Sequence, residues 1–264
     1  MNKKIEKIKL KKNKTKITCL TAYSKNIAKI IDNYCDLILV GDSMANVLYG
    51  LKNTHSITLE NIIQHTISVK KGTKKSLLVV DMPKNSYNNY KSAITNSKLI
   101  IKKTGCDAVK LESNNKNFKI IRNLVNKNVP VMGHIGYTPQ FKKEFKIEGD
   151  TSKKSRKLLK EALAIEKAGA FSIVLECISP ETSKLITSSL KIPTIGIGSS
   201  SFCDGQILVT DDMLGLSGFY PKFVKKYVNL ERIIEKAIKK YTREVKLNKF
   251  PTINNFLNGT KRRK

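Results

Sequence analysis

Acidic side chains stand at the ends of several short apolar runs in this sequence. Asp42, Asp81 and Glu112 each end or closely follow such a run, and Lys110 lies two residues before Glu112, on the same face of the expected strand. Each carboxylate could simply cap the helix or turn that follows it. Three of them on neighbouring strands, with Lys110 beside them, favour instead an all-oxygen site for a hard cation, most of all Mg²⁺.

Three further polar residues occupy comparable positions. Glu176 ends a strongly apolar run, where burial would raise its pKa and make it a candidate general base; a salt bridge to a Lys is the alternative. His134 also ends a run, and it is either a proton carrier or ligand donor, or a structural residue. Ser43 could donate to a substrate carboxylate or cap a helix. We assign no role to His55 or His65, and the His and Cys spacings do not suit zinc.

The elements that must position these residues are short apolar runs that alternate with longer amphipathic segments. Several runs are continuously apolar, as expected of parallel strands covered on both faces. Eight such strands with helical crossovers predict an α/β fold, a single (β/α)8 TIM barrel spanning residues 1–264 as one domain, with its chemistry at the carboxyl ends of the strands. The expected strands are Ile17–Thr21, Asp36–Val40, Ser76–Asp81, Asp107–Glu112, Val129–His134, Phe171–Glu176, Pro193–Ile197 and Gln206–Val209.

Helical stripes lie between these runs. The clearest is a C-terminal one, formed by Ile234, Ala237, Ile238 and Tyr241. Gly105, Asn128 and Gly169 follow helical patterns, and we expect each to adopt the left-handed conformation that commonly ends a helix. The basic segments Lys11–Lys16 and Lys261–Lys264 are expected to be short solvated extensions.

The net charge of +29 raises the possibility of a nucleic-acid-binding protein. However, only six of the 50 basic residues are Arg, and the Lys residues are spread along the whole chain instead of being clustered on one element. Specific nucleic-acid binding is therefore not expected. The five cysteines are far apart and form no CxxC pair, which indicates reduced thiols in a cytoplasmic protein. The basic N-terminus has no apolar signal region, and no apolar run approaches the roughly 20 residues that a membrane helix needs, so no membrane association is expected.

The residues at the strand ends also carry a resemblance to a known family. The sequence resembles the ketopantoate hydroxymethyltransferases from about Thr15 to Lys246, and the stretches GHIGYTPQ and DGQILV are specific to that pattern. The matching segments are Val40–Ser43 with Gly50 downstream, Asp81–Pro83, Val109–Glu112, Gly133–Gln140, Val174–Cys177, Ile195–Gly198 and Asp204–Val209.

This resemblance implies a barrel of the phosphoenolpyruvate/pyruvate type that moves a hydroxymethyl group from 5,10-methylenetetrahydrofolate to 3-methyl-2-oxobutanoate, giving 2-dehydropantoate for pantothenate and coenzyme A synthesis. It further implies a ring-like homo-oligomer. Carried over by position, Asp42, Asp81 and Glu112 match the Mg²⁺ ligands, and Glu176 matches the proton acceptor. The keto-acid contacts of the family match Asp42, Ser43, Asp81 and Lys110.

The sequence departs from the family pattern in its loops. The segment Phe141–Asp150 is shorter than usual in the family. Ser199 and Ser200 replace the usual Ala and Gly, and Ala45 stands where Gly is common. These departures affect the expected folate affinity and turnover more than the reaction type. A related Mg²⁺-dependent lyase or mutase acting on 2-oxo acids is the alternative enzyme, because it would carry a similar set of carboxylates at the carboxyl ends of its barrel strands.

Overall fold

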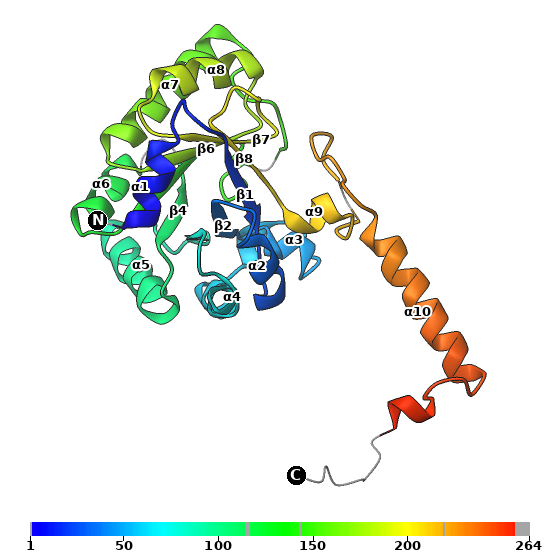
Figure 1. Cartoon of the computed structure of the whole chain (residues 1–264). Helices are drawn as coiled ribbons and strands as arrows, with labels where there is room; N and C mark the ends of the chain where they lie inside the picture. The colour runs from blue at the N-terminus through cyan, green and yellow to red at the C-terminus, as the bar shows by residue number, and fades with distance from the viewer. Residues whose placement is uncertain (1, 114–116, 143, 219, 257–264) are drawn as a thin grey trace.

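The chain folds into a closed barrel of eight parallel strands, seen in the computed structural model, which describes residues 2–113, 117–142, 144–218 and 220–256. The strands pair in chain order, and β8 pairs back with β1 (Figure 1). The predicted (β/α)8 barrel is therefore confirmed, and each predicted strand is present with its ends shifted by at most two residues. The strands are β1 Ile17–Thr21, β2 Leu37–Val40, β3 Leu77–Asp81, β4 Ala108–Glu112, β5 Val131–Gly136, β6 Ser172–Glu176, β7 Thr194–Ile197 and β8 Gly205–Leu208.

Helices follow most strands and pack around the barrel (Figure 1). The α-helices are α1 Lys3–Leu10, α2 Lys25–Ile31, α3 Met44–Val47, α4 Leu59–Gly72, α5 Tyr90–Thr104, α6 Phe118–Asn126, α7 Ser152–Lys167, α8 Pro180–Ser189, α9 Thr210–Leu214 and α10 Leu230–Lys246. Two 3-10 helices, η1 Thr54–Ser56 and η2 Ile253–Asn255, complete the set. The predicted left-handed residues are confirmed, since φ is +65° at Gly105, +60° at Asn128 and +97° at Gly169.

Alternation along the strands divides the core into two layers. Leu37 and Leu77 belong to an inner cluster, whereas their neighbours Ile38 and Leu78 pack with helix residues such as Ile62 in an outer one. Every residue of β2 and β3 is buried, which explains why these strands are continuously apolar in sequence. This rigid double layer holds the strand ends in fixed positions.

The N-terminal segment is part of the barrel and not a solvated extension. Ile5 and Ile8 of α1 join the inner cluster, so this helix covers the amino ends of the strands. The expectation that Lys11–Lys16 is solvated was wrong for Lys12, whose Nζ lies 2.8 Å from Oδ2 of buried Asp204. An isolated carboxylate is too costly to bury without a partner, and Lys12 supplies that partner. The second expected extension, Lys261–Lys264, lies outside the described residues.

The outer face of the barrel is incompletely covered between β8 and β1. Thr18 on β1 and Gln206 on β8 point outward, opposite to the inner-cluster residues beside them, and both are exposed. The reason is that α9 is a short helix and α10 then leaves the barrel (Figure 1). Among the residues that the structure describes, no helix therefore occupies the place where an eighth barrel helix would pack.

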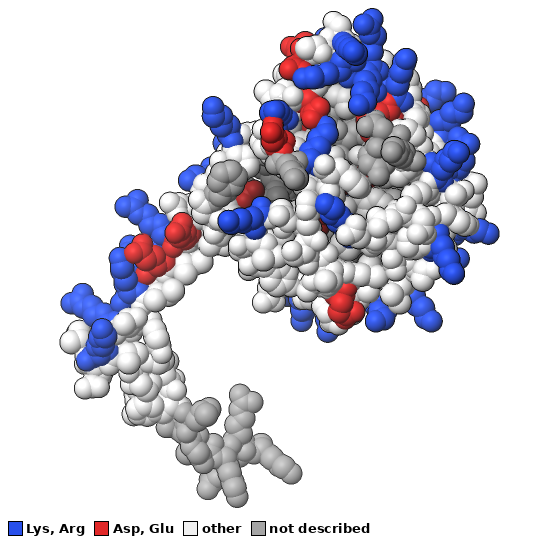
Figure 2. Space-filling view, turned by 180° about the vertical axis from the view of Figure 1, so that it is seen from behind, with Lys and Arg blue, Asp and Glu red and all other residues white. Residues whose placement is uncertain are grey.

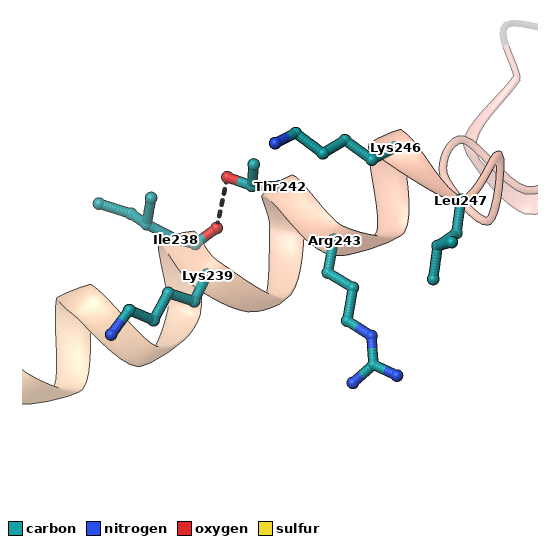
Figure 3. Close-up of a pocket in the computed structure, with 6 residues that line it drawn as sticks. All are labelled: Ile238, Lys239, Thr242, Arg243, Lys246 and Leu247. Atoms are coloured by element: carbon teal, nitrogen blue, oxygen red, sulfur yellow. Dashed lines mark hydrogen bonds between the residues drawn. The ribbon is translucent and has the colours of Figure 1, made fainter.

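Helix α10 projects from the barrel with an exposed apolar stripe. The predicted helix is confirmed, yet none of its residues, all of which the structure describes, is buried. Ile234, Ile238, Tyr241 and Val245 recur every three or four residues and stay 41–58% exposed. The shallow hollow in Figure 3 is lined from one side alone, by Ile238, Lys239, Thr242, Arg243, Lys246 and Leu247. Nothing in the described chain closes it from the other side.

Basic side chains are dispersed over the surface. On the face shown in Figure 2, Lys and Arg residues lie all around the barrel and along α10, instead of forming one patch. This dispersal matches the expectation drawn from the sequence and gives no support for a nucleic-acid interface on that face. Within the described ranges, no helix has both the length and the apolar character needed to cross a bilayer.

Candidate active site

The predicted site residues converge at the carboxyl ends of β2 to β6. Asp42 follows β2, Asp81 ends β3 and Glu112 ends β4, while β5 and β6 carry His134 and Glu176. The parallel register places Asp81 beside Lys110 and Glu112 beside His134. The fold therefore brings together residues that are up to 134 positions apart in sequence, from Asp42 to Glu176.

Asp42 and Asp81 form a buried pair of carboxylates with Lys110. Oδ1 of Asp81 lies 2.8 Å from Nζ of Lys110, and Oδ2 of Asp81 accepts a hydrogen bond of 3.0 Å from the backbone N–H of Asp42. Burial, together with the nearby charge of Asp81, raises the pKa of Asp42 to about 7, although Lys110 opposes the rise. Burial disfavours the charged form of Lys110, but Asp81, Glu112 and Asp42 outweigh this and raise its pKa above the usual value.

Glu112 is 1% exposed and lies between these residues and His134. Its Oε2 accepts a hydrogen bond of 2.9 Å from the backbone N–H of Gln140, and its Oε1 lies 3.7 Å from Nδ1 of His134. Burial raises the pKa of Glu112 well above its ordinary value, and the charge of Asp42 adds to that rise. Three carboxylates thus share one small region in which Lys110 is the nearby cation.

Glu176 lies at the end of β6 with its carboxylate 3.0 Å from Nε2 of His134. Burial raises the pKa of Glu176 to about 8, while Lys110 acts in the opposite direction. This rise is what its position at the end of an apolar strand predicted. His134 is 2% exposed, and burial followed by the charge of Lys110 lowers its pKa well below the usual value, so its imidazole is neutral.

Ser43 is the N-cap residue immediately before α3, but its side chain makes no capping hydrogen bond. Its Oγ lies 2.8 Å from the hydroxyl of Tyr23, and the backbone carbonyl of Tyr23 is 2.8 Å from Nδ1 of His65. The hydroxyl of Ser43 is therefore held beside Asp42 by a tyrosine on the first barrel loop. His65 has a structural contact, and His55 similarly lies 3.1 Å from the carbonyl of Pro139.

The donor set fits a hard divalent cation, although it is not a complete cage. All the candidate ligands are carboxylate oxygens, and Oδ1 of Asp81 is buried in its ion pair with Lys110. Burial is the main cause of the raised pKa values of Asp42 and Glu112, and the charges of neighbouring carboxylates add to it. Among the described residues, no three His, Cys, Asp or Glu side chains come together closely enough to hold a metal ion. The three carboxylates thus surround a common region without forming a three-ligand site.

Gln140 and Tyr87 are site residues that the motif analysis left without a role. Gln140 is 1% exposed, and its amide nitrogen donates 2.8 Å to Oδ2 of Asp42 and 3.0 Å to the carbonyl of Met82. The hydroxyl of Tyr87 donates 2.6 Å to the amide oxygen of Gln140. The signal that could have found Gln140 is its place in the GHIGYTPQ stretch, where it closes a specific motif immediately after β5.

Comparison with known proteins decides the family. The family model described as ketopantoate hydroxymethyltransferase matches residues 2–253. The chain belongs to the ketopantoate hydroxymethyltransferase family. Its 3-methyl-2-oxobutanoate hydroxymethyltransferase relatives include a protein of Pelagibacter ubique, 52% identical over 96% of this chain and 98% of the relative. A Clostridioides difficile relative of the same name is 49% identical over 89% and 88% of the two chains.

Solved structures show the same barrel at low sequence identity. A 2,3-dimethylmalate lyase of the PEP mutase/isocitrate lyase superfamily has a TM-score of 0.62 at 12% identity, covering 98% of this chain and 93% of that one. A phosphonopyruvate hydrolase solved with oxalate and Mg²⁺ has a TM-score of 0.60 at 13% identity, covering 95% and 92%. At these identities the likeness concerns the fold alone.

The departures from the ketopantoate hydroxymethyltransferase pattern lie beside the cluster and not within it. Ser199 donates 2.7 Å to the carbonyl of Leu175 and accepts 3.1 Å from the N–H of Ile178, so its hydroxyl ties the loops after β6 and β7 together. Ala45 is fully buried in α3. In the shortened loop, Lys142 forms an ion pair of 2.5 Å with Glu148. None of these residues contacts a candidate ligand or Glu176 through a described hydrogen bond.

Proposed function

We propose that this chain transfers a hydroxymethyl group from 5,10-methylenetetrahydrofolate to 3-methyl-2-oxobutanoate, giving 2-dehydropantoate. The observation that carries the proposal is a half-buried glutamate of raised pKa, Glu176, placed beside a set of three carboxylates and a lysine in a member of this family. The substrate has one hydrogen on C3, and a base must remove it before a carbon–carbon bond can form there.

Asp42, Asp81 and Glu112 are the residues that would hold Mg²⁺. When bound, Mg²⁺ would polarise the keto oxygen of the substrate and stabilise negative charge there. Mg²⁺ commonly takes one or two carboxylates directly and keeps several waters, so it does not require three converged ligands. The burial of all three carboxylates around the single nearby charge of Lys110 supports this assignment.

Glu176 is the proposed base, and Lys110 the proposed electrostatic partner of the developing oxyanion. Glu176 takes the proton from C3 while the electron pair moves onto the keto oxygen, giving an enolate. Water adds to the methylene carbon of the folate, and both bonds from that carbon to folate nitrogens break, which releases tetrahydrofolate and a formaldehyde-level one-carbon unit. C3 of the enolate then bonds to this carbon, and its oxygen takes a proton to become the hydroxyl group. Lys110, which is held 2.8 Å from Oδ1 of Asp81, would place its positive charge beside the oxygen that becomes negative. Ser43 and the two aspartates are proposed to contact the keto acid.

A 2-oxo-acid lyase or mutase is the second candidate, favoured by the fold likeness to enzymes of that kind. Purified protein should be incubated with 3-methyl-2-oxobutanoate, Mg²⁺ and methylenetetrahydrofolate, with parallel samples that lack the folate or contain a chelator. Our proposal requires 2-dehydropantoate in the complete mixture alone. Consumption of 2-oxo acids without the folate would favour the lyase or mutase, and full activity after chelation would contradict the metal assignment.

We further propose that the chain acts in the cytoplasm as a homo-oligomer. All five cysteines, each within the described ranges, are free thiols, which suits a reducing compartment. The exposed stripe of α10 and the uncovered β8–β1 face are both parts of the molecule that a second copy could bury. One copy's α10 is proposed to pack against another copy, because none of its residues is buried against its own barrel.

A further inference from the structure

Gln140 links three of the strand ends that carry the candidate site. Its side chain reaches Asp42 after β2 and the carbonyl of Met82 after β3, and its backbone N–H reaches Glu112 on β4. The residue itself lies on the loop that follows β5. A buried amide with this many partners is held in one position, and it therefore helps to fix the positions of the carboxylates that it contacts.

Each of the three carboxylates has one oxygen occupied by a protein N–H. Oδ2 of Asp81 accepts from the backbone of Asp42, whereas Oδ2 of Asp42 and Oε2 of Glu112 both accept from Gln140. Of the remaining oxygens, Oδ1 of Asp81 forms the ion pair with Lys110, whereas Oδ1 of Asp42 and Oε1 of Glu112 accept no described hydrogen bond. A carboxylate held through one oxygen presents the other in a fixed direction. Gln140 therefore orients two of the three.

The orientation of the Gln140 amide is set by chemistry. Its nitrogen faces the carboxylate of Asp42 and the carbonyl of Met82, both of which can only accept. Its oxygen faces the hydroxyl of Tyr87, which donates at 2.6 Å. Reversing the amide would place oxygen against two acceptors in a buried site, which is strongly unfavourable. Tyr87 therefore holds Gln140 in the orientation that holds Asp42.

We propose that Gln140, fixed by Tyr87, is a positioning residue that turns the free oxygens of Asp42 and Glu112 toward the divalent cation. This inference rests on the proposed function, because it concerns the same cation. It assigns a task to the last residue of the GHIGYTPQ stretch, for which the proposed chemistry has no other use. Gln140 acts through the carboxylates and touches neither the reacting carbon nor its proton.

The test measures binding of Mn²⁺, as a paramagnetic stand-in for Mg²⁺, to metal-free full-length protein by electron paramagnetic resonance. Gln140→Met keeps the length of the side chain and removes its side-chain hydrogen bonds, including the one that orients Asp42, while the backbone N–H still reaches Glu112. We expect it to weaken Mn²⁺ binding by about 10- to 100-fold, the usual effect of losing a residue that orients a metal ligand. The Mg²⁺ concentration that half-saturates turnover should rise by a similar factor, with a smaller change in KM for the keto acid at saturating Mg²⁺.

Two further variants separate this role from a general loss of structure. Tyr87→Phe keeps the ring and removes the hydroxyl, so the fold should survive and Mn²⁺ binding should weaken by about threefold, the effect of one hydrogen bond. Gln64→Met, on the exposed face of α4, makes the same exchange far from the site and should bind Mn²⁺ normally. Unchanged affinity in folded Gln140→Met and Tyr87→Phe would overturn the inference while leaving the proposed function intact. Absence of Mn²⁺ binding by the unaltered protein would overturn both.

Discussion

Nε2 of His134 lies 3.0 Å from Oε2 of Glu176, at the ends of the adjacent strands β5 and β6. The other ring nitrogen, Nδ1, is 3.3 Å from Nζ of Lys110 and 3.7 Å from Oε1 of Glu112. Nε2 makes no aligned hydrogen bond among the described residues, so its relation to Glu176 is one of close approach. The imidazole of His134 therefore lies between the proposed base and the lysine beside the carboxylates.

Replacing Glu176 by Gln should abolish exchange of the C3 hydrogen of 3-methyl-2-oxobutanoate, because the base is lost while the size of the side chain is kept. The expected decrease in rate is about 100- to 10,000-fold. Exchange can be followed by proton NMR in deuterated buffer without any folate. Keto-acid binding, measured by calorimetry in the presence of Mg²⁺, should remain close to that of the unaltered protein. Full exchange activity in the variant would refute the role of Glu176.

The raised pKa of Glu176 predicts a rate that increases with pH. Burial raises this pKa to about 8, so the carboxyl is protonated below that value and cannot accept a proton. We expect kcat/KM, which reports the free enzyme, to rise about tenfold per pH unit below pH 8 and to level off above it. The residual activity of Glu176→Gln should lack this step. A profile that is flat from pH 6 to pH 9 in the unaltered enzyme would contradict the assignment.

The ion pair between Lys12 and Asp204 should contribute strongly to stability. Asp204 also accepts hydrogen bonds from the backbone of Asn13 and Thr194, so its charge is buried in the centre of a network. Lys12→Ala leaves that charge without its partner and should lower the free energy of unfolding by about 3 kcal/mol in urea denaturation.

The more exposed pair of Lys11 with Asp36 provides the control, since its side chains are 31% and 25% exposed, against 9% and 4% in the pair of Lys12 with Asp204. Lys11→Ala removes the same charge from the same segment, and it should cost about 0.5 kcal/mol. Equal losses in the two variants would show that the burial of the Lys12 pair has no energetic consequence.

Gly136 is predicted to tolerate no side chain. Its φ is +97°, and a Cβ atom would lie 2.1 Å from the backbone oxygen of Glu176. Gly136→Ala should therefore destabilise the fold by about 4 kcal/mol, from backbone strain and overpacking together. It should also reduce activity, because the displaced backbone carries the proposed base. Gly50→Ala is the matched control, with φ of +62° and open space around it, and it should cost about 1 kcal/mol. Thermal melts of both variants test this difference.

An acidic residue on the apolar stripe of α10 should disrupt the proposed oligomer. Ile238 is 58% exposed in the isolated chain, and Ile238→Asp places a charge where the partner copy would bury an apolar side chain. Light scattering coupled to size exclusion should then report a smaller species. Lys240→Asp introduces the same residue on the opposite side of the helix and should keep the assembly. A monomeric unaltered protein would contradict the proposal at once.

The strand-end residues could be placed from sequence because two simple regularities fix them. Apolar runs of strand length mark where Asp81, Glu112 and Glu176 stand, and parallel strands must present those ends at one mouth. Register then follows from barrel closure. This is why the positions of the candidate base and carboxylates relative to the strands agreed with the structure within two residues.

The other features depend on contacts between segments whose spacing carries no signal. Gln140 lies in a loop, and no periodicity indicates that this loop folds back over Asp42. Lys12 reads as one lysine among many, and its burial follows from Asp204, which lies 192 positions away. For α10 the apolar stripe correctly predicted a helix, but a stripe does not specify which molecule covers it.

The uncovered outer face of the barrel between β8 and β1 has a thermodynamic consequence for the proposed assembly. When a neighbouring molecule supplies the missing cover, folding and association become linked equilibria, and mass action enters the stability of each barrel. The melting temperature should then fall as the protein is diluted, even though every covalent and internal contact of the single chain is unchanged. Stability in this protein would be a property of its concentration as well as of its sequence.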